Sequence, residues 1–448
     1  MSLELSEGEF REAVELLQGL LRIDTTNPPG EERPAADFVA TALAADGIES
    51  RIVESAPGRA NLVARLEGSG EERPLLLTSH LDVVPARGED WAQGPFSGEE
   101  ADGGIWGRGA IDMKGMTAMG VSVLRHLKRR GAGLRRDVIL AAVADEEAGC
   151  AQGSAFMVRE HADLIDAEYV VNEVGGFSLT ISGKRFYPVQ VAEKGVAWLK
   201  IRATGEAGHS SLPAPDSCLG RMGEAMHRLA TTRLPVHVTE PAAAFVRGVA
   251  AHMPGPTRMV MEGLLKPGKV GEMLDSFIRN REQKAVFHAI LSNTANPTMV
   301  RGGSKINVLP GHAEFEVDGR LLPGQTAADL VREIEGVIGG GFEIEVMREA
   351  PGTVFSWDSP FFEKIREVVA ARDPEGIVVP YMAPGFTDSS EYGKTGATCY
   401  GFYPLRLPEE IVFSKLFHGV DERIPLSSYR FGIETLYDLV ESFAGEGR

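Results

Sequence analysis

The chain has 448 residues, of which 43% are hydrophobic and 25% charged. This length exceeds what one hydrophobic core supports, so we expect at least two domains, and the composition excludes a wholly disordered chain. The formal net charge of −18 opposes binding to nucleic acid or to anionic lipid, because both carry negative charge.

The cysteines and the amino terminus bear on the compartment. Cys150, Cys218 and Cys399 are widely spaced and odd in number, which favours neither a disulfide framework nor a cysteine zinc site. The first ten residues are acidic and lack the basic and apolar regions of a secretory signal. Apolar runs fall short of the ~18 residues of a membrane span. We therefore expect a soluble, cytoplasmic protein.

The first part of the chain alternates between helical and strand patterns. Apolar spacing predicts helices at 7–23, 35–43 and 113–130, and strands at 60–66, 74–79, 137–144 and 168–172. These strands are apolar without strict alternation, which indicates burial on both faces, as in mainly parallel sheets covered by helices. We predict an α/β fold with a mainly parallel sheet.

Near residue 188 the pattern changes to strands that alternate between apolar and polar residues. We predict strands at 194–204 and 342–348, a strand pair within 306–321, and helices at 217–231 and 326–338. A helix at 360–372 and a strand at 397–402 then resume the first pattern. The sequence therefore predicts an α+β domain at 188–350, inserted into a domain formed by 1–187 and 351–448. Residues 236–300 are not assigned to elements.

Acidic and imidazole side chains follow several of the predicted strands. The strand at 74–79 leads to His80 and Asp82, that at 137–144 to Asp145, Glu146 and Glu147, and that at 168–172 to Glu173, while a glycine-rich loop carries Asp112. In open α/β sheets, ligands bind at the carboxyl ends of the strands, so these groups can converge. Convergent carboxylates repel one another unless a cation neutralises them, which favours a divalent metal site.

Two local patterns refine this hypothesis. His80 and Asp82 lie on the same side of an extended strand, as suits a metal-bound imidazole held by a carboxylate. The alternative is a strand-end histidine beside a solvated aspartate. Glu146 and Glu147 are neighbours, so a division between metal ligation and proton transfer is one interpretation. A solvated acidic turn is the other.

Five motifs in order make the pattern specific: HLDVVP at 80–85, GRGAIDMKG at 107–115, ADEEAG at 144–149, NEVGG at 172–176 and HGVDERIP at 418–425. Together they resemble the dinuclear-zinc metallopeptidase and deacylase family of glutamate carboxypeptidase, aminoacylase, acetylornithine deacetylase and succinyl-diaminopimelate desuccinylase. The resemblance extends over nearly the whole chain. It implies a zinc-exopeptidase-like catalytic domain at 1–187 and 351–448 and a lid and dimerisation domain at 188–350.

The resemblance also implies a centre of two Zn²⁺ ions. His80, Asp112 and Glu173 would hold one ion, and Asp112 would bridge to a second ion held by Glu147 and His418. Three carboxylates and two imidazoles suit Zn²⁺, with Co²⁺ or Mn²⁺ as substitutes. The peptide bond after Asp112 is expected to be cis.

Two acidic residues would act beside these ligands. Asp82 would hold the imidazole of His80 in place. Glu146 would be the general base, taking a proton from a metal-bridging water and passing it to the leaving nitrogen.

The resemblance extends to substrate contacts. His209, in GEAGHSS at 205–211, would reach the active site of a partner subunit and stabilise the oxyanion, whereas an isolated histidine of this kind is usually an exposed loop residue. Asn307 and Arg320 would bind the substrate's carbonyl and carboxylate, with a surface ion pair as the alternative for Arg320. Gly385 and Thr387, in APGFTDSSEYG at 383–393, would contact the carboxylate.

We therefore expect a dinuclear zinc peptidase or amidohydrolase of the carboxypeptidase, dipeptidase or aminoacylase type. It would cleave an amide bond in a small peptide or N-acyl amino acid with a free carboxylate, as a homodimer through the inserted domain, with no nucleic-acid or membrane partner. One alternative is an aminopeptidase with a related dinuclear site. The other is a catalytically silent metal-binding homologue.

Overall fold

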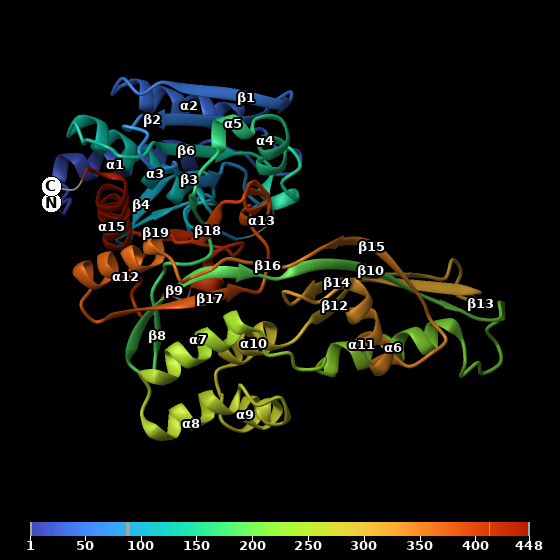
Figure 1. Ribbon diagram of the computed structural model, residues 1–448. Helices are drawn as coiled ribbons and strands as arrows, with labels where there is room; N and C mark the ends of the chain where they lie inside the picture. Colours follow the sequence, from blue (N-terminus) through green and yellow to red (C-terminus); the bar gives the residue numbers. More distant parts are fainter. Residues whose placement is uncertain (1, 87–89, 412, 447–448) are drawn as a thin grey trace. The chain divides into compact units, whose positions relative to one another are not determined.

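The computed structural model describes residues 2–86, 90–411 and 413–446, shown as a ribbon in Figure 1. The chain divides into two compact units. Unit 1 comprises Met1–Val191, Phe355–Pro380 and Thr387–Arg448, and unit 2 comprises Ala192–Val354 and Tyr381–Phe386. The sequence places the inserted domain at 188–350 and assigns 381–386 to the other domain.

Unit 1 is built on a mixed sheet whose strand order is β1-β2-β6-β3-β7-β18-β9, with β8 also paired to β9. The strands are β1 (Ser50–Ala56), β2 (Arg59–Leu66), β3 (Leu75–His80), β6 (Val138–Val143), β7 (Tyr169–Asn172), β8 (Leu179–Ile181), β9 (Lys184–Glu193) and β18 (Thr398–Gly401). In the centre, β3 runs parallel to β6 and β7, and β18 runs parallel to β7. The outer pairs are antiparallel. The predicted α/β class with a mainly parallel core is confirmed.

Both faces of this sheet are buried. Leu75 and Leu77 of β3 belong to one core cluster, and Leu76 between them belongs to another. Figure 1 shows the helices whose apolar residues complete these clusters. The first cluster includes α1 (Glu7–Leu21), α2 (Arg33–Ala44), α3 (Lys114–Arg129), α12 (Pro360–Arg372) and α15 (Leu426–Ala444), and the second α4 (Ser154–Glu160), α5 (Ala162–Ile165) and α13 (Ser389–Tyr392). Burial on both faces explains why these strands are apolar throughout.

The 19-residue helix α15 was not among the predicted elements. Tyr429, Ile433, Leu436 and Val440 lie on it at helical spacing and are buried in the first core cluster. A short separate sheet, ordered β19-β5-β4, lies in the same unit and comprises β4 (Glu99–Ala101), β5 (Gly104–Trp106) and β19 (Arg423–Pro425). The remaining short elements are η1 (Glu146–Ala148), η3 (Gly393–Thr395) and α14 (Phe413–Leu416). The eight-residue strand β17 (Gly376–Ala383) pairs with β9, and its residues 381–383 belong to unit 2.

Unit 2 contains an antiparallel sheet in the order β12-β14-β10-β15. Its strands are β10 (Gly195–Thr204), β12 (Thr294–Gly302), β14 (His312–Leu321) and β15 (Glu343–Ala350), packed against α6 (Cys218–Thr231) and α11 (Ala327–Ile338). Residues 236–300 supply α7 (Glu240–Ala251), α8 (Gly255–Gly263), η2 (Pro267–Lys269), α9 (Val270–Ser276) and α10 (Arg281–Leu291) in addition to most of β12. The short strands β11 (Gly208–His209), β13 (Val308–Leu309) and β16 (Thr353–Val354) complete the unit.

The strand pair predicted within 306–321 does not form. β13 pairs with β11, whereas β14 pairs with β10 and β12. Both edges of β14 are therefore occupied, and β13 has no edge of β14 to join. Among the described residues, no helix combines the length and apolar character needed to cross a membrane.

Candidate metal centre

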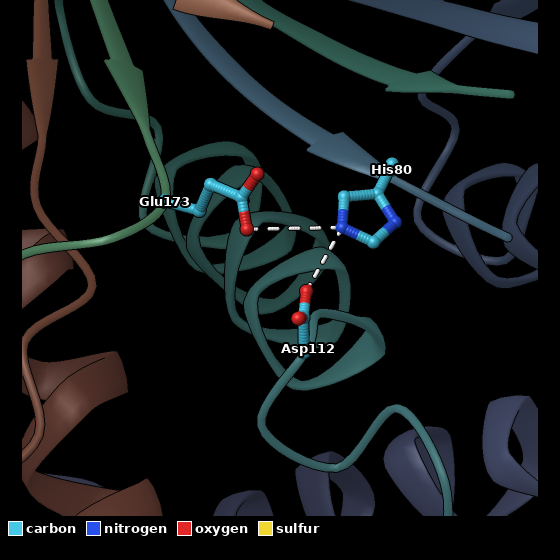
Figure 2. A group of neighbouring side chains, drawn as sticks. All are labelled: His80, Asp112 and Glu173. Carbon is cyan, nitrogen blue, oxygen red and sulfur yellow. Dashed lines mark hydrogen bonds and ion pairs between the residues drawn. The ribbon is translucent and has the colours of Figure 1, made fainter. Parts of the chain in front are cut away.

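Three side chains from separate segments of unit 1 converge at the carboxyl end of the parallel strands. His80 is the last residue of β3, Glu173 follows β7, and Asp112 precedes α3. The Nε2 atom of His80 lies 3.0 Å from Oδ1 of Asp112 and 3.7 Å from Oε2 of Glu173. Figure 2 shows these three side chains pointing toward one another. They could hold one metal ion and are called the inner ligand group below.

A second group shares Asp112 with the first. The Nε2 atom of His418 lies 3.2 Å from Oδ2 of Asp112 and 3.0 Å from Oε2 of Glu147. Asp112 therefore directs one oxygen to each imidazole. Asp112, Glu147 and His418 could hold another ion and are called the outer ligand group.

The backbone that carries these ligands departs from regular structure. The peptide bond between Asp112 and Met113 is cis. His418 has a φ of 58°, and Asp145, just before η1, has a φ of 68°. The left-handed region is uncommon for residues other than glycine and is concentrated at functional sites.

Asp82 connects the two ligand groups without belonging to either. Its backbone carbonyl lies 2.9 Å from Nδ1 of His80, and its Oδ1 lies 3.5 Å from the same nitrogen. Oδ1 also accepts the backbone N–H of Glu146 at 3.1 Å. Its Oδ2 accepts the backbone N–H of Glu147 at 3.2 Å and the side-chain amide of Asn27 at 2.8 Å. Asp82 thus orients His80 through its backbone carbonyl and its carboxylate, and the same carboxylate holds the turn that carries Glu147.

A buried polar network that the sequence did not suggest surrounds Asp82. Asn27 also donates to Asp145 at 3.0 Å, and Arg59 donates to the same oxygen of Asp145 at 2.8 Å. Arg59 in turn pairs with the fully buried Glu32 at 2.8 Å. No spacing pattern in the sequence links these residues, because their contacts join distant segments.

The two imidazoles and the shared aspartate form strongly coupled pairs. Burial alone would lower the pKa of His80, but hydrogen bonds to Asp112, Asp82 and Glu173 raise it well above its usual value. Hydrogen bonds to Asp112 and Glu147 raise the pKa of His418 to about 10. Burial opposes ionisation of Asp112, yet the hydrogen bonds from His418 and His80 lower its pKa. Each imidazole is therefore surrounded by groups that favour a positive charge at its position.

The pKa values of the three neighbouring glutamates are raised, whereas that of Asp112 is lowered. Burial raises the pKa of Glu173 to about 8, and it raises the pKa of Glu146 well above its usual value, with Glu173 adding to the effect. Burial and the neighbouring Asp112 also raise the pKa of Glu147. Crowded buried carboxylates that resist ionisation, together with imidazole nitrogens, are the donor set that a divalent cation stabilises. The residues present therefore fit a metal centre.

Four of the predicted substrate residues, His209, Asn307, Arg320 and Gly385, lie in unit 2. His209, in β11, is exposed, and its Nδ1 accepts the backbone N–H of Ser211 at 3.2 Å. Asn307 is also exposed, and its backbone carbonyl accepts the backbone N–H of Ser210 at 3.4 Å. Arg320, on β14, donates to Asp318 at 3.0 Å and lies over the ring of Phe386 at 5.6 Å.

The two remaining predicted contacts are Gly385 and Thr387. The carbonyl of Gly385 accepts the backbone N–H of Lys194 at 3.2 Å in unit 2. Thr387, in unit 1, is 1% exposed, and its hydroxyl accepts from the amide of Asn172 at 3.3 Å. The Thr387 hydroxyl thus holds the residue beside Glu173, a contact that the sequence did not suggest.

Residues 76–442 match the model of peptidase family M20/M25/M40. The chain belongs to this family. The match confirms the family resemblance inferred from the motifs and establishes the chain as a metal-dependent hydrolase of the M20 type.

Individual M20 relatives cover most of the chain. The human N-fatty-acyl-amino acid synthase/hydrolase PM20D1 is 27% identical over 381 residues, covering 83% of this chain and 74% of its own. Aminoacylase-1 of Sus scrofa is 26% identical over 451 residues, which cover 98% of this chain and 96% of the aminoacylase. The crystal structure of the M20 metallo-carboxypeptidase Sso-CP2 from Sulfolobus solfataricus superposes on this chain with a TM-score of 0.71 at 18% identity. The match covers 98% of this chain and 99% of the carboxypeptidase. This structural likeness shows a shared fold.

Proposed function

We propose that this M20 hydrolase uses two divalent ions to cleave the amide bond of an N-acyl amino acid or small peptide with a free carboxylate. The observation that carries the proposal is the position of Asp112, whose two oxygens face His80 and His418 in separate ligand groups. A carboxylate shared in this way suits a bridge between two cations.

The inner and outer ligand groups would hold one ion each, with Zn²⁺ as the expected metal and Co²⁺ or Mn²⁺ as substitutes. When bound, such ions polarise a substrate carbonyl and make water more acidic. The protein contributes the orientation of the ligands. Asp82 holds His80 on one side and the turn bearing Glu147 on the other.

Glu146 is proposed to move the proton. It lies in η1 beside Glu147, is 8% exposed and belongs to neither ligand group. Its backbone N–H is fixed by Asp82, so the position of this carboxylate is tied to that of His80. We assign Glu146 the role of general base that accepts a proton from water and returns it to the leaving nitrogen.

N-acyl amino acids are the first substrate class to test. Two relatives are named as an N-fatty-acyl-amino acid synthase/hydrolase and as an aminoacylase. The roles expected for His209, Asn307, Arg320, Gly385 and Thr387 stay predictions, as do the assignment of the two units to catalysis and to a lid, dimerisation and a cytoplasmic location.

The decisive experiment removes the metal and restores it. Protein stripped with a chelator should lose hydrolysis of N-acyl amino acids and dipeptides, and Zn²⁺ should restore it at two ions per chain. Dipeptides blocked at the amino end should remain substrates, whereas those blocked at the carboxyl end should not. Cleavage that survives metal removal contradicts the two-metal proposal, and the opposite blocking pattern indicates an aminopeptidase.

A further inference from the structure

A buried carboxylate links two of the three segments that contribute residues to the outer group, those of Asp112 and His418. Glu422 is fully buried and follows His418 in the same motif. Its Oε1 accepts the backbone N–H groups of Ile111 at 2.7 Å and of Asp112 at 3.0 Å. Its Oε2 accepts from Nη1 of Arg108 at 2.8 Å.

Backbone hydrogen bonds also join the segment that follows His418 to the segment that precedes Asp112. β19, which follows Glu422, pairs with β5, and Arg423 lies opposite Trp106. The carbonyl of Glu422 also accepts the backbone N–H of Gly107 at 2.9 Å. The segment leaving the His418 loop is therefore bonded to the segment entering the Asp112 loop, through both backbone and side chain.

The ligands differ in how firmly the rest of the fold holds them. His80 is fully buried at the end of β3, which is paired with β6 and β7 on its two sides. His418 is 48% exposed in a loop, at a φ of 58°. The placement of His418 relative to Asp112 thus depends more on local connections than the placement of His80 does.

We propose that Glu422 is a positioning residue that sets the placement of Asp112 relative to His418 and so determines the affinity of the outer metal site. This inference rests on the proposed two-metal function. A glutamine at position 422 retains an oxygen for the two backbone N–H groups but directs an N–H group at Arg108 or leaves that guanidinium without its carboxylate. The loop connection weakens while the inner group keeps His80 and Glu173 in place.

Metal affinity, measured apart from activity, tests the inference. Metal-free wild-type protein and E422Q would be titrated with Zn²⁺ in competition with a chromophoric chelator, and folding would be checked by circular dichroism. We expect two ions in the wild type, and in E422Q one site weakened at least ~10-fold while the other stays within about threefold, as when residues that orient metal ligands are lost. The kcat of E422Q should recover at high Zn²⁺ with KM unchanged.

Asp373→Asn is the matched control. Asp373 is a buried carboxylate of unit 1 that pairs with Arg185, and its described contacts include no residue of either ligand group. This variant should lose stability and keep both affinities. A second variant, Arg108→Lys, retains Glu422 and a cation, so it should weaken the same site by a smaller factor, and it decides the question if E422Q does not fold.

The possible outcomes distinguish failure of the role proposed for Glu422 from failure of the proposed two-metal function. Wild-type protein that binds fewer than two ions overturns both. Wild-type protein with two sites, combined with a folded E422Q that has wild-type affinities, overturns only the role of Glu422. Equal weakening of both sites in E422Q also overturns the specific effect on the outer site, because Asp112 belongs to both groups and its displacement would then act on both ions alike.

Discussion

The side-chain amide of Asn27 donates a hydrogen bond to Oδ2 of Asp82 at 2.8 Å, within the buried interior of unit 1. Asp82 contacts His80 of the inner ligand group, so Asn27 acts on that imidazole through one intermediate residue. This connection joins the turn after α1 to the end of β3.

Asn27→Ala should weaken metal binding. Loss of the amide leaves Asp82 with fewer donors and freer to rotate away from His80, and such changes around metal ligands typically cost ~10-fold or more in affinity. Chelator competition measures the effect. Asn293→Ala, which removes a buried asparagine of unit 2, should leave both affinities unchanged. Equal affinities in Asn27→Ala and wild type would show that Asp82 needs no support from Asn27.

Glu146→Gln should retain both ions and lose turnover by ~10²-fold or more, because proton transfer is removed while the ligands remain. Metal analysis and single-turnover kinetics on an N-acyl amino acid check this expectation. Glu147→Gln is the matched variant and should lose one ion. A reversed result, with metal lost from Glu146→Gln, would exchange the roles of the two glutamates.

Metal removal should lower the unfolding temperature. Without metal, the buried carboxylates lie close to one another and repel. A metal ion present at a free concentration 100 times its dissociation constant stabilises the folded state by about 2.7 kcal/mol. Calorimetry of the stripped protein across a Zn²⁺ series measures the change. His418→Ala should show a smaller increase, since it lacks one ligand of the outer group. A transition that does not respond to Zn²⁺ would count against metal binding to the folded chain.

Asp373→Asn should reduce the loss of stability in acid. Burial alone would raise the pKa of Asp373, but hydrogen bonds from Arg185 and Tyr187 lower it. The folded protein therefore binds this proton less readily than the unfolded chain. The resulting stabilisation is present above the unfolded pKa, ~3.9, and is lost as the pH falls through the lower folded value.

Urea denaturation at a series of pH values measures this effect. At pH 7 the variant should lose about 2 kcal/mol of the free energy of unfolding, and its dependence on pH below ~4 should be shallower than that of the wild type. Glu363→Gln, an exposed change on α12, should follow the wild-type curve. Parallel curves for Asp373→Asn and wild type would exclude a depressed pKa.

Arg320→Met should raise KM for substrates with a free carboxylate by ~10-fold or more, because a charged hydrogen-bond donor is lost. Substrates with an amidated carboxyl group should be affected little. Arg301→Met, on the exposed strand β12, is the control. An equal effect on both substrate types would assign Arg320 to the ion pair with Asp318 alone.

The predicted metal-binding residues illustrate what local sequence can reveal. His80 and Glu173 follow apolar runs of a length and pattern typical of buried parallel strands, and parallel strands share one carboxyl edge. Their convergence could be predicted without a structure. Asp112 was expected to join them from its glycine-rich loop, and the family motifs then added His418 and the sharing of Asp112 between two ions.

Other features had no local pattern that identified them. Glu422 reads as one more charge in HGVDERIP, and only the pairing of β19 with β5 brings its carboxylate to the backbone of Asp112. The pairing of β13 with β11 was likewise not predictable from local sequence. It depends on β10 and β12 occupying both edges of β14, which is a property of the whole sheet of unit 2.

The amino-acid sequence alone determined the chemical character of this protein: histidines and carboxylates after buried strands, in motifs of an M20 hydrolase. Such information is local, because side-chain type and strand periodicity are carried by neighbouring residues. Only the tertiary structure decided which polar groups support those ligands. Asn27, Arg59 and Glu422 reach the site through contacts between distant segments, and those contacts depend on how the segments pack.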